Sequence, residues 1–302
     1  MEGSVFYMDR HLVIFTTDKR QENLGRLFAG EKRRLTWEAQ KEPMFFQDLK
    51  KGEKSEWIYV LPTPVAKLEG KSLLKEYLQE ELIRRNEDVC GNVKVFGGVL
   101  GPEWVAFLEE NRIVYWDFMK LPEVVEGNAQ ITAEGTVAQV LSLAEYSILG
   151  QSILVTGYGY CGKKIAKVFA QMGANVTVVA RNKKVREGVE ADGLKAIDFY
   201  DMPKALPEYK IVINTVPALV LKEEGIRQLP PDACIIDIAS KPGGTDFEAA
   251  EKYGIAAKLA LGLPGIYTTS SSAMLLKNAI LKYAPLKENE NGGKLWIYQI
   301  II

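Results

Sequence analysis

The sequence predicts an α/β protein of two doubly wound, parallel-sheet lobes joined by a connecting helix and a returning C-terminal helix. Short apolar runs alternate with segments of helical spacing along the 302 residues, which is typical of a parallel sheet covered by helices. A glycine-rich G-x-G-x-x-G turn separates one such strand from its helix, so the lobes are expected to be Rossmann-like. We expect an N-terminal α/β substrate lobe at residues 1–131, completed by part of 270–302, and a cofactor lobe at 132–269.

Composition limits the classes of function. Hydrophobic residues make up 47% and charged residues 25% of the chain, and the formal net charge is −1. Lys and Arg are scattered, so neither nucleic acid nor a membrane is an expected partner. The sequence shows no leader and no apolar run long enough to span a bilayer, which predicts a cytoplasmic protein. Cys90, Cys161 and Cys234 form no C-x-x-C pair, so neither a disulfide framework nor a metal site is expected.

The N-terminal lobe is predicted from alternating segments. Strands are expected at 11–15, 57–61, 93–96 and 113–116, with helices at 21–28, 72–86 and 104–108. Because Thr16, Thr17 and Asp18 stand where a glycine turn would be, we expect this first loop to face substrate and not cofactor. Lys19 and Arg20 are candidate partners for a carboxylate; alternatively they form the solvated first turn of a helix. The only histidine, His11, opens a strand and is expected to be structural.

Residues 132–149 have the spacing of the connecting helix. Thr132 is its predicted N-cap, and Glu134 and Thr136 fall in the predicted first turn, where they can face a cleft between the lobes. Helix capping alone explains these residues equally well.

The cofactor lobe opens with an apolar strand at 153–156, followed by Gly157, Gly159 and Gly162 and then a helix. The first glycine permits the tight turn, the second lets a pyrophosphate approach the backbone, and the third lets helix and strand pack closely. Tyr160 and Cys161 lie inside the turn and are included in the predicted cofactor site. The helix N-terminus can lower the pKa of the Cys161 thiol, although a small residue that simply fits is the favoured interpretation.

The end of the next strand, at 175–179, indicates which dinucleotide is bound. NAD sites place an acidic residue there, whereas this chain has Arg181, Asn182 and Lys183. Positive charge favours the 2′-phosphate of NADP, with a solvated basic turn as the alternative.

Further strands at 210–217, 233–239 and 256–260 complete the second lobe. Thr215, Val216 and Pro217 end the first of them and are predicted to line the cofactor wall. A helix at 270–283, a polar linker at 287–293 and an apolar tail at 295–302 end the chain. The tail is expected to pair with a sheet edge or with a neighbouring subunit, which leaves a homo-oligomer open.

Several motifs resemble the A subunits of bacterial dipicolinate synthases. They are residues 133–136, 157–162, 173–176, 213–217, 237–247, 250–255 and 262–266. The resemblance runs from about residue 110 to 285. It is looser in the N-terminal lobe, where the family's first strand tends to lead into a glycine pair, although Asp18, Arg20 and Gln21 still match its pattern.

The resemblance implies a sporulation enzyme of the mother-cell cytoplasm that oxidises a dihydrodipicolinate with NADP and works with a flavoprotein-like B subunit. Because the ring becomes aromatic, positioning matters more than a strong base. Two carboxylates on the substrate require cations and donors. The candidates for the reacting centre are Lys241, Ser240 and Glu134, with Asp246 as another possible base; those for substrate binding are Arg20, Lys241, Gly243, Gly244, Thr245, Thr268 and Ser270.

Two other functions stay open. The chain can be an NADP-linked dehydrogenase of an open-chain amino or hydroxy acid, although the absence of a histidine near the predicted cleft disfavours a hydroxy acid. It can also be a non-catalytic, cofactor-binding subunit that docks a flavoprotein partner through its apolar tail.

Overall fold

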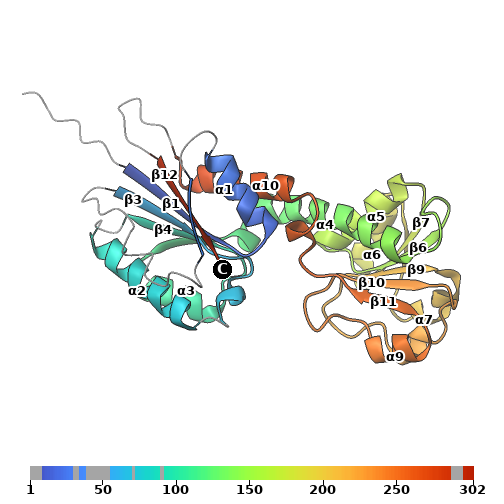
Figure 1. Cartoon of the computed structure of the whole chain (residues 1–302). Helices are drawn as coiled ribbons and strands as arrows, with labels where there is room; N and C mark the ends of the chain where they lie inside the picture. Colours follow the sequence, from blue (N-terminus) through green and yellow to red (C-terminus); the bar gives the residue numbers. More distant parts are fainter. Residues whose placement is uncertain (1–8, 30–33, 39–54, 70–71, 89–91, 287–294) are drawn as a thin grey trace, which may run out of the picture. The chain divides into compact units, whose positions relative to one another are not determined.

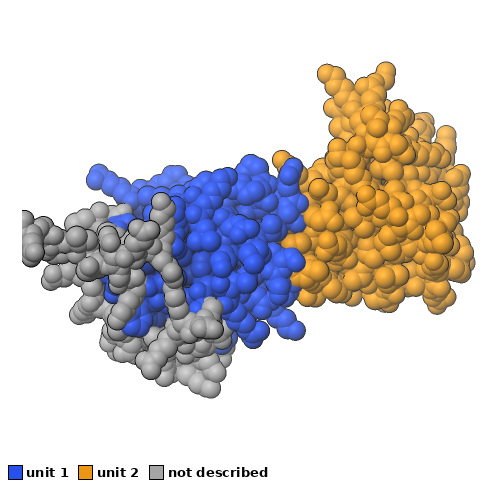
Figure 2. Space-filling view, turned by 90° about the horizontal axis from the view of Figure 1, so that it is seen from above, with its two compact units in different colours: residues 1–127, 269–302 blue, residues 128–268 orange. Residues whose placement is uncertain are grey.

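The computed structural model describes residues 9–29, 34–38, 55–69, 72–88, 92–286 and 295–302. The chain divides into two compact units, which Figure 2 shows in two colours: Met1–Gly127 with Thr269–Ile302, and Asn128–Thr268. The sequence placed these boundaries at 131/132 and 269/270. Each unit holds a six-stranded sheet in its described residues, and all pairs of neighbouring strands are parallel, which confirms the predicted fold class. Cys90 and the linker at 287–293 lie outside the described residues.

Unit 1 has the strand order β2-β12-β1-β3-β4-β5. The strands are β1 (Asp9–Thr16), β2 (Arg34–Glu38), β3 (Ser55–Val60), β4 (Val93–Gly97), β5 (Val114–Asp117) and β12 (Leu295–Ile301). The sequence prediction missed β2, and it found both ends of each of the other five strands to within two residues.

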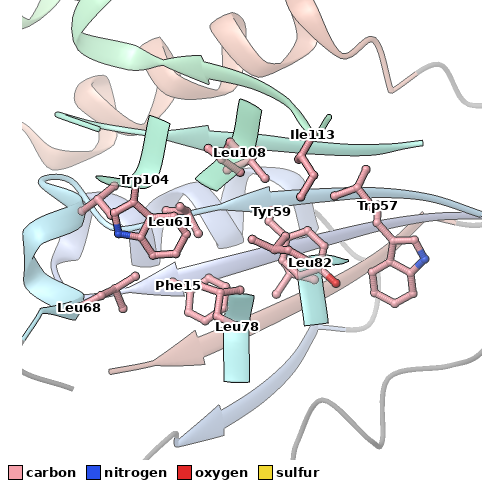
Figure 3. Packing of buried hydrophobic residues seen from close by; sticks show 14 of the residues in the cluster. Phe15, Trp57, Tyr59, Leu61, Leu68, Leu78, Leu82, Trp104, Leu108 and Ile113 are labelled. Atoms are coloured by element: carbon pink, nitrogen blue, oxygen red, sulfur yellow. The ribbon is translucent and has the colours of Figure 1, made fainter. Parts of the chain in front are cut away.

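Helices cover both faces of this sheet (Figure 1): α2 (Ser72–Asp88) and α3 (Pro102–Glu110) on one face, α1 (Lys19–Ala29) and α10 (Thr269–Tyr283) on the other. Successive strand residues alternate between these faces. Trp57 and Tyr59 of β3 pack with Leu78 and Leu82 of α2, as Figure 3 shows, while Ile58 packs on the α1 side. The central strands are therefore apolar on both faces, which explains why they appear in the sequence as continuous apolar runs.

The C-terminal tail is an interior strand, so the prediction that it would pair with a sheet edge or another subunit was wrong. β12 pairs in parallel with β1 on one side and with β2 on the other. Ile297, Tyr298 and Ile300 are buried in the unit's own cores. They are therefore not available as a docking surface for a partner.

Unit 2 has the strand order β11-β10-β9-β6-β7-β8. Its strands are β6 (Ser152–Thr156), β7 (Asn175–Val179), β8 (Lys195–Ile197), β9 (Ile211–Asn214), β10 (Cys234–Asp237) and β11 (Ala256–Leu259). One face is packed by α5 (Tyr160–Gln171), α6 (Lys183–Ala191) and part of α4 (Pro122–Leu143), and the other by α7 (Met202–Ala205), α8 (Glu223–Ile226) and α9 (Phe247–Lys252).

The connecting helix differs from its prediction at both ends. α4 spans Pro122–Leu143 and crosses the boundary between the units. The helix begins early because Pro122 suits its first position. It contains Gly127 at a point of close packing, where a Cβ would come within 2.5 Å of the Leu275 side chain on α10. Thr132 therefore lies in mid-helix and is not an N-cap. None of the described helices is long and apolar enough to cross a membrane.

Candidate functional site

The candidate cofactor site of unit 2 lies where the strand order reverses. The chain leaves β6 through α5 toward β7 on one side, whereas β9 on the other side of β6 leads away to β10. In open α/β sheets this switch point leaves a crevice at the carboxyl ends of the two strands. Residues 157–162 follow β6 and residues 215–217 follow β9, and a Cβ on Gly157 would touch Thr215 and Val216, so both predicted segments lie together at this end of the sheet.

The three glycines of the turn differ in what a side chain at each position would meet. Gly157 has φ +87°, and a Cβ there would come within 2.7 Å of the Thr215 hydroxyl. A Cβ on Gly162 would come within 2.4 Å of the Gly157 carbonyl oxygen, so a side chain at this position would push α5 away from the strand. A Cβ on Gly159 would meet nothing within 4 Å. Packing therefore requires glycine at 157 and 162, whereas Gly159 borders open space.

The N-terminus of α5 faces this turn. The Lys163 N–H donates to the Gly159 carbonyl at 2.9 Å, so the N–H groups of Tyr160, Cys161 and Gly162 have no acceptor within the helix. Such groups and the helix dipole favour a phosphate. The Tyr160 side chain is 61% exposed, whereas burial raises the pKa of the Cys161 thiol and a hydrogen bond with Thr132 opposes the shift. Desolvation therefore outweighs the helix N-terminus, so the alternative of a lowered thiol pKa is wrong and the favoured interpretation of a small residue that fits stands.

A buried hydrogen-bond network holds the loop after β9. The fully buried Asn214 accepts from the Thr156 hydroxyl and from the Val216 N–H, and its amide donates to the Val216 carbonyl. The Thr215 hydroxyl donates to the Thr156 carbonyl at 2.7 Å. These bonds join the ends of β6 and β9, so Val216 and the exposed Pro217 are held beside the glycine turn.

The loop after β10 is organised by the buried carboxylate of Asp237. It accepts from the Ala239 N–H at 3.0 Å, from the Gly244 N–H at 2.8 Å and from the Thr245 hydroxyl at 2.7 Å. The donors of Gly244 and Thr245, which the sequence assigned to substrate, are thus used inside the loop. Neither the sequence motif nor its spacing indicated that Asp237 would take them.

The backbone conformation and the packing of this loop explain its two glycines. Gly243 has φ +90°, and a Cβ on Gly244 would come within 2.5 Å of the Val216 and Ala218 carbonyl oxygens. The loop therefore packs tightly against the segment after β9. Ser240 and Lys241 stay exposed, and no described carboxylate lies within ion-pair distance of the Lys241 ammonium.

The basic turn after β7 carries an exposed guanidinium. Arg181 is exposed and lies 5.3 Å from the centroid of the Phe199 ring, while Asn182 caps α6 by accepting from the Lys184 N–H. Arg186 instead donates to two carbonyls of the turn and to the carboxylate of Asp198. Arg186 is thereby neutralised. Arg181 and Lys183 lie at the place where a 2′-phosphate is expected, and Lys183 is exposed with its ammonium 4.0 Å from the Glu187 carboxylate.

A cluster around Asp192 joins α5 to the end of α6. Its carboxylate accepts from the Tyr158 hydroxyl at 2.7 Å and from the ammonium of Lys167 at 2.8 Å, and pairs with Lys163 at 2.9 Å. These bonds, led by the one from Lys167, hold the pKa of Asp192 well below its usual range. Burial, followed by the bond to Asp192, raises the pKa of Tyr158. Local sequence patterns do not predict this cluster, because its members are far apart in the chain.

The remaining candidates are distributed over both units. Glu134 lies on the exposed side of α4 and accepts from Gln130 at 3.4 Å, and Asp246 caps α9 through the Ala249 N–H. Thr268, with φ +46°, ends unit 2. Ser270 belongs to unit 1, where its hydroxyl accepts from the Asn23 amide on α1 at 3.3 Å.

Arg20 lies at the corresponding edge of unit 1. It is only 5% exposed and donates to the Asp18 carboxylate at 3.4 Å and to the Thr63 carbonyl at 3.3 Å. Burial lowers the pKa of Arg20, and the charge of Asp18 opposes the shift. The alternative of a solvated residue is therefore wrong for Arg20, although it holds for the exposed Lys19. Among the described residues, no three His, Cys, Asp or Glu side chains are placed to hold a metal ion.

Comparisons with known proteins agree with this geometry. Residues 120–241 match the model of the D-isomer specific 2-hydroxyacid dehydrogenase, NAD binding domain. The chain is 30% identical over 235 residues to the dipicolinate synthase A subunit of Bacillus subtilis (strain 168), which covers 76% of this chain and 78% of that protein.

Solved structures extend the similarity to both units. The structure of the dipicolinate synthase A subunit from Bacillus halodurans aligns with a TM-score of 0.73 at 24% identity, covering 92% of this chain and 98% of that one. The corresponding protein from Bacillus subtilis aligns with a TM-score of 0.71 at 23% identity, covering 94% and 97%.

Proposed function

The chain belongs to the family of dipicolinate synthase A subunits and is an NAD(P)-dependent oxidoreductase, and we propose that it oxidises a dihydrodipicolinate to pyridine-2,6-dicarboxylate with NADP. The observation that carries the proposal is the glycine turn at the switch point of unit 2, which has open space beside Gly159 and exposed cations after β7. Family membership supplies the substrate class.

The residues of unit 2 fit a nicotinamide dinucleotide. Gly159 and the first-turn N–H groups of α5 would hold the pyrophosphate, and Val216 and Pro217 would line the wall beside it. Arg181 and Lys183 would pair with the 2′-phosphate, since no carboxylate follows β7 to bind a ribose hydroxyl. When bound, the nicotinamide accepts a hydride.

Substrate positioning falls to residues on the loop after β10. Lys241 has no carboxylate partner among the described residues, and Ser240 beside it is exposed, so both can bind an anionic substrate. Oxidation of the dihydropyridine releases one hydride and one proton, and the gain of aromaticity drives it. We therefore expect these residues to orient the ring and its carboxylates, with no strong base required.

The proposal is tested with the purified chain, dihydrodipicolinate and NADP under anaerobic conditions, so that oxygen does not oxidise the substrate. We expect NADPH and pyridine-2,6-dicarboxylate to form in equal amounts, with slower turnover when NAD replaces NADP. If neither forms with the chain alone but both form when a flavoprotein-like B subunit is added, the chain is a cofactor-binding docking protein instead.

The match to the 2-hydroxyacid dehydrogenase model favours a second candidate, oxidation of an open-chain acid. The position of His11 argues against oxidation of a hydroxy acid, because that reaction needs a proton acceptor. His11 is the only histidine, and it is buried in the unit 1 sheet, stacked on Trp57 at 4.0 Å. Reduction of NADP by 2-hydroxy acids or amino acids, and not by dihydrodipicolinate, would establish this candidate.

The cellular setting follows the Bacillus subtilis relative, whose name makes it one of at least two different subunits of a synthase. We propose that this chain acts with a B subunit, in the cytoplasm of the mother cell during sporulation. Because the C-terminal strand is buried in unit 1, docking to that partner would use another surface.

A further inference from the structure

We propose that the carboxyl edge of the unit 1 sheet binds one carboxylate of the substrate, with Lys67 and Arg20 as its two cations. The inference rests on the proposed function, because that function supplies the cyclic dicarboxylate that this site would bind. Arg20 was expected in this role from the sequence; Lys67 was not.

The position in the fold is the first support. β1 continues through α1 to β2 on one side of the sheet, whereas its neighbour β3 continues through α2 to β4 on the other. This is the switch point of unit 1, and a doubly wound sheet binds ligands in the crevice at that point. The two loops that flank it are residues 16–18 after β1 and residues 61–67 after β3.

The charge at this edge of the sheet is the second support. The Lys67 ammonium lies 3.2 Å from Asp18 Oδ2, and Arg20 Nη2 lies 3.4 Å from the same oxygen. Lys67 also donates to the Thr17 hydroxyl at 3.1 Å. No further carboxylate pairs with either cation within the described ranges, so two positive charges share one negative charge. The cluster retains one unit of positive charge that an anion can neutralise.

Buried polar groups without partners are the third support. The Nε of Arg20 and the hydroxyl oxygen of Thr63 are buried and have no hydrogen-bond partner among the described residues. Arg20 and Thr63 are 5% and 8% exposed. Burying a cation that is incompletely hydrogen-bonded costs free energy, which an adjacent anion offsets. Asp18 alone therefore does not satisfy this site.

The backbone next to the Thr63 loop is strained. The Val65 N–H donates to the Gly98 carbonyl at 2.9 Å, and a Cβ on Gly98 would come within 2.3 Å of the Thr63 side chain. Val99 then adopts φ +56°, which is rare for a β-branched residue, and the Asp117 carboxylate accepts its N–H at 3.0 Å. Strain of this kind concentrates at ligand sites.

Lys67 is the residue to change, because it is partly exposed and its removal leaves the buried Arg20 in place. In the full-length protein we expect Lys67→Ala to raise the KM for dihydrodipicolinate, and the Kd for pyridine-2,6-dicarboxylate in calorimetry, by about tenfold through loss of a charge-assisted contact. Lys67→Arg should restore most of the affinity. The matched control is Lys75→Ala, which removes another partly buried unit 1 lysine, one paired with Glu103 at 2.7 Å. NADP affinity should stay unchanged in all three variants.

Each outcome separates this inference from the proposed function. Normal turnover by the wild-type chain with an unchanged KM in Lys67→Ala would overturn the carboxylate site and leave the function standing. Dicarboxylate binding that depends on Lys67 in a chain that does not oxidise dihydrodipicolinate would support the site and overturn the function. Equal weakening by Lys67→Ala and Lys75→Ala would also overturn the site, because the effect would then be general electrostatics.

Discussion

At the scale of single residues, the glycine turn contains one glycine that packing requires and one that cofactor binding is expected to require. Gly162 is required because its neighbour is backbone, whereas Gly159 has open space where a Cβ would point. Gly159 also has φ −75°, which alanine adopts without strain.

Gly159→Ala should therefore leave folding intact and weaken cofactor binding, because the added methyl group occupies the space that a pyrophosphate needs. We expect the Tm to change by no more than about 2 °C, since a surface substitution free of clashes alters stability little. The NADP Kd, measured by fluorescence titration, should rise at least tenfold. An unchanged Kd would show that the phosphates do not approach Gly159.

Gly162→Ala should act on stability as well. The Cβ would lie 2.4 Å from the Gly157 carbonyl oxygen, and neither piece of backbone can move without shifting α5. Overpacking of this kind costs about 1–3 kcal/mol, which urea unfolding measures. Gly188→Ala on α6 is the control, because its Cβ meets nothing within 4 Å and alanine favours a helix. Equal stability of Gly162→Ala and the wild type would contradict the packing argument.

In the proposed site, Arg181 is the residue expected to favour NADP over NAD. Arg181→Asp should weaken NADP binding far more than NAD binding, because it replaces a phosphate partner with a carboxylate that repels phosphate and accepts from a ribose hydroxyl. Titration of each dinucleotide against the variant measures the ratio. The Lys204→Asp variant carries the same charge change on α7 and serves as control. Equal losses for both dinucleotides would contradict the assignment of the 2′-phosphate.

At the scale of secondary-structure elements, the Asp192 cluster joins α5 to α6. The folded pKa of Asp192 is lowered, so its stabilising contribution is complete above the ordinary aspartate pKa of about 3.9 and is lost as pH falls through the folded value. Asp192→Asn should therefore lower the urea midpoint at pH 7, with a difference from wild type that shrinks below about pH 4. A difference independent of pH would show that packing, and not charge, joins the helices.

β12 shows how an element at the end of the chain supports elements at its start. The strand lies between β1 and β2, and its Gln299 amide donates to the Thr16 hydroxyl at 2.8 Å beside the start of α1. Deletion of the chain after Leu286 would expose the edge of β1 and remove several buried apolar side chains. We expect unit 1 to become protease-sensitive while a unit 2 fragment survives digestion, as peptide mapping would reveal. Uniform sensitivity of both units would contradict the independence of their cores.

At the scale of the whole molecule, each unit has its own pair of hydrophobic cores, one on each face of its sheet. Because the proposed dinucleotide site lies within unit 2, NADP should selectively stabilise that unit. Ligand at 100 times its Kd adds about 2.7 kcal/mol to the state that binds it. Calorimetry should resolve two transitions, with only the unit 2 transition moving upward. An equal shift of both transitions would indicate that the units unfold together.

Local patterns predicted much of this architecture. The central strands are apolar on both faces, so 11–15, 57–61, 153–156 and 211–214 stand out from their surroundings as continuous apolar runs. The glycine turn was predictable for a similar reason, because its requirements are local to a strand, a turn and a helix. β2 and the start of α4 were missed or misplaced, since their boundaries depend on what packs against them, as Gly127 against Leu275 shows.

The sequence by itself therefore determined the fold class, the glycine turn, the exposed basic turn after β7 and the family. Only the tertiary structure decided that β12 is an interior strand, that Asp237 uses the Gly244 and Thr245 donors, and that Arg20 and Lys67 share Asp18. The physical reason is range. Strand and turn patterns depend on neighbours in the chain, whereas the partner of a polar side chain depends on which distant segment the sheet order brings beside it.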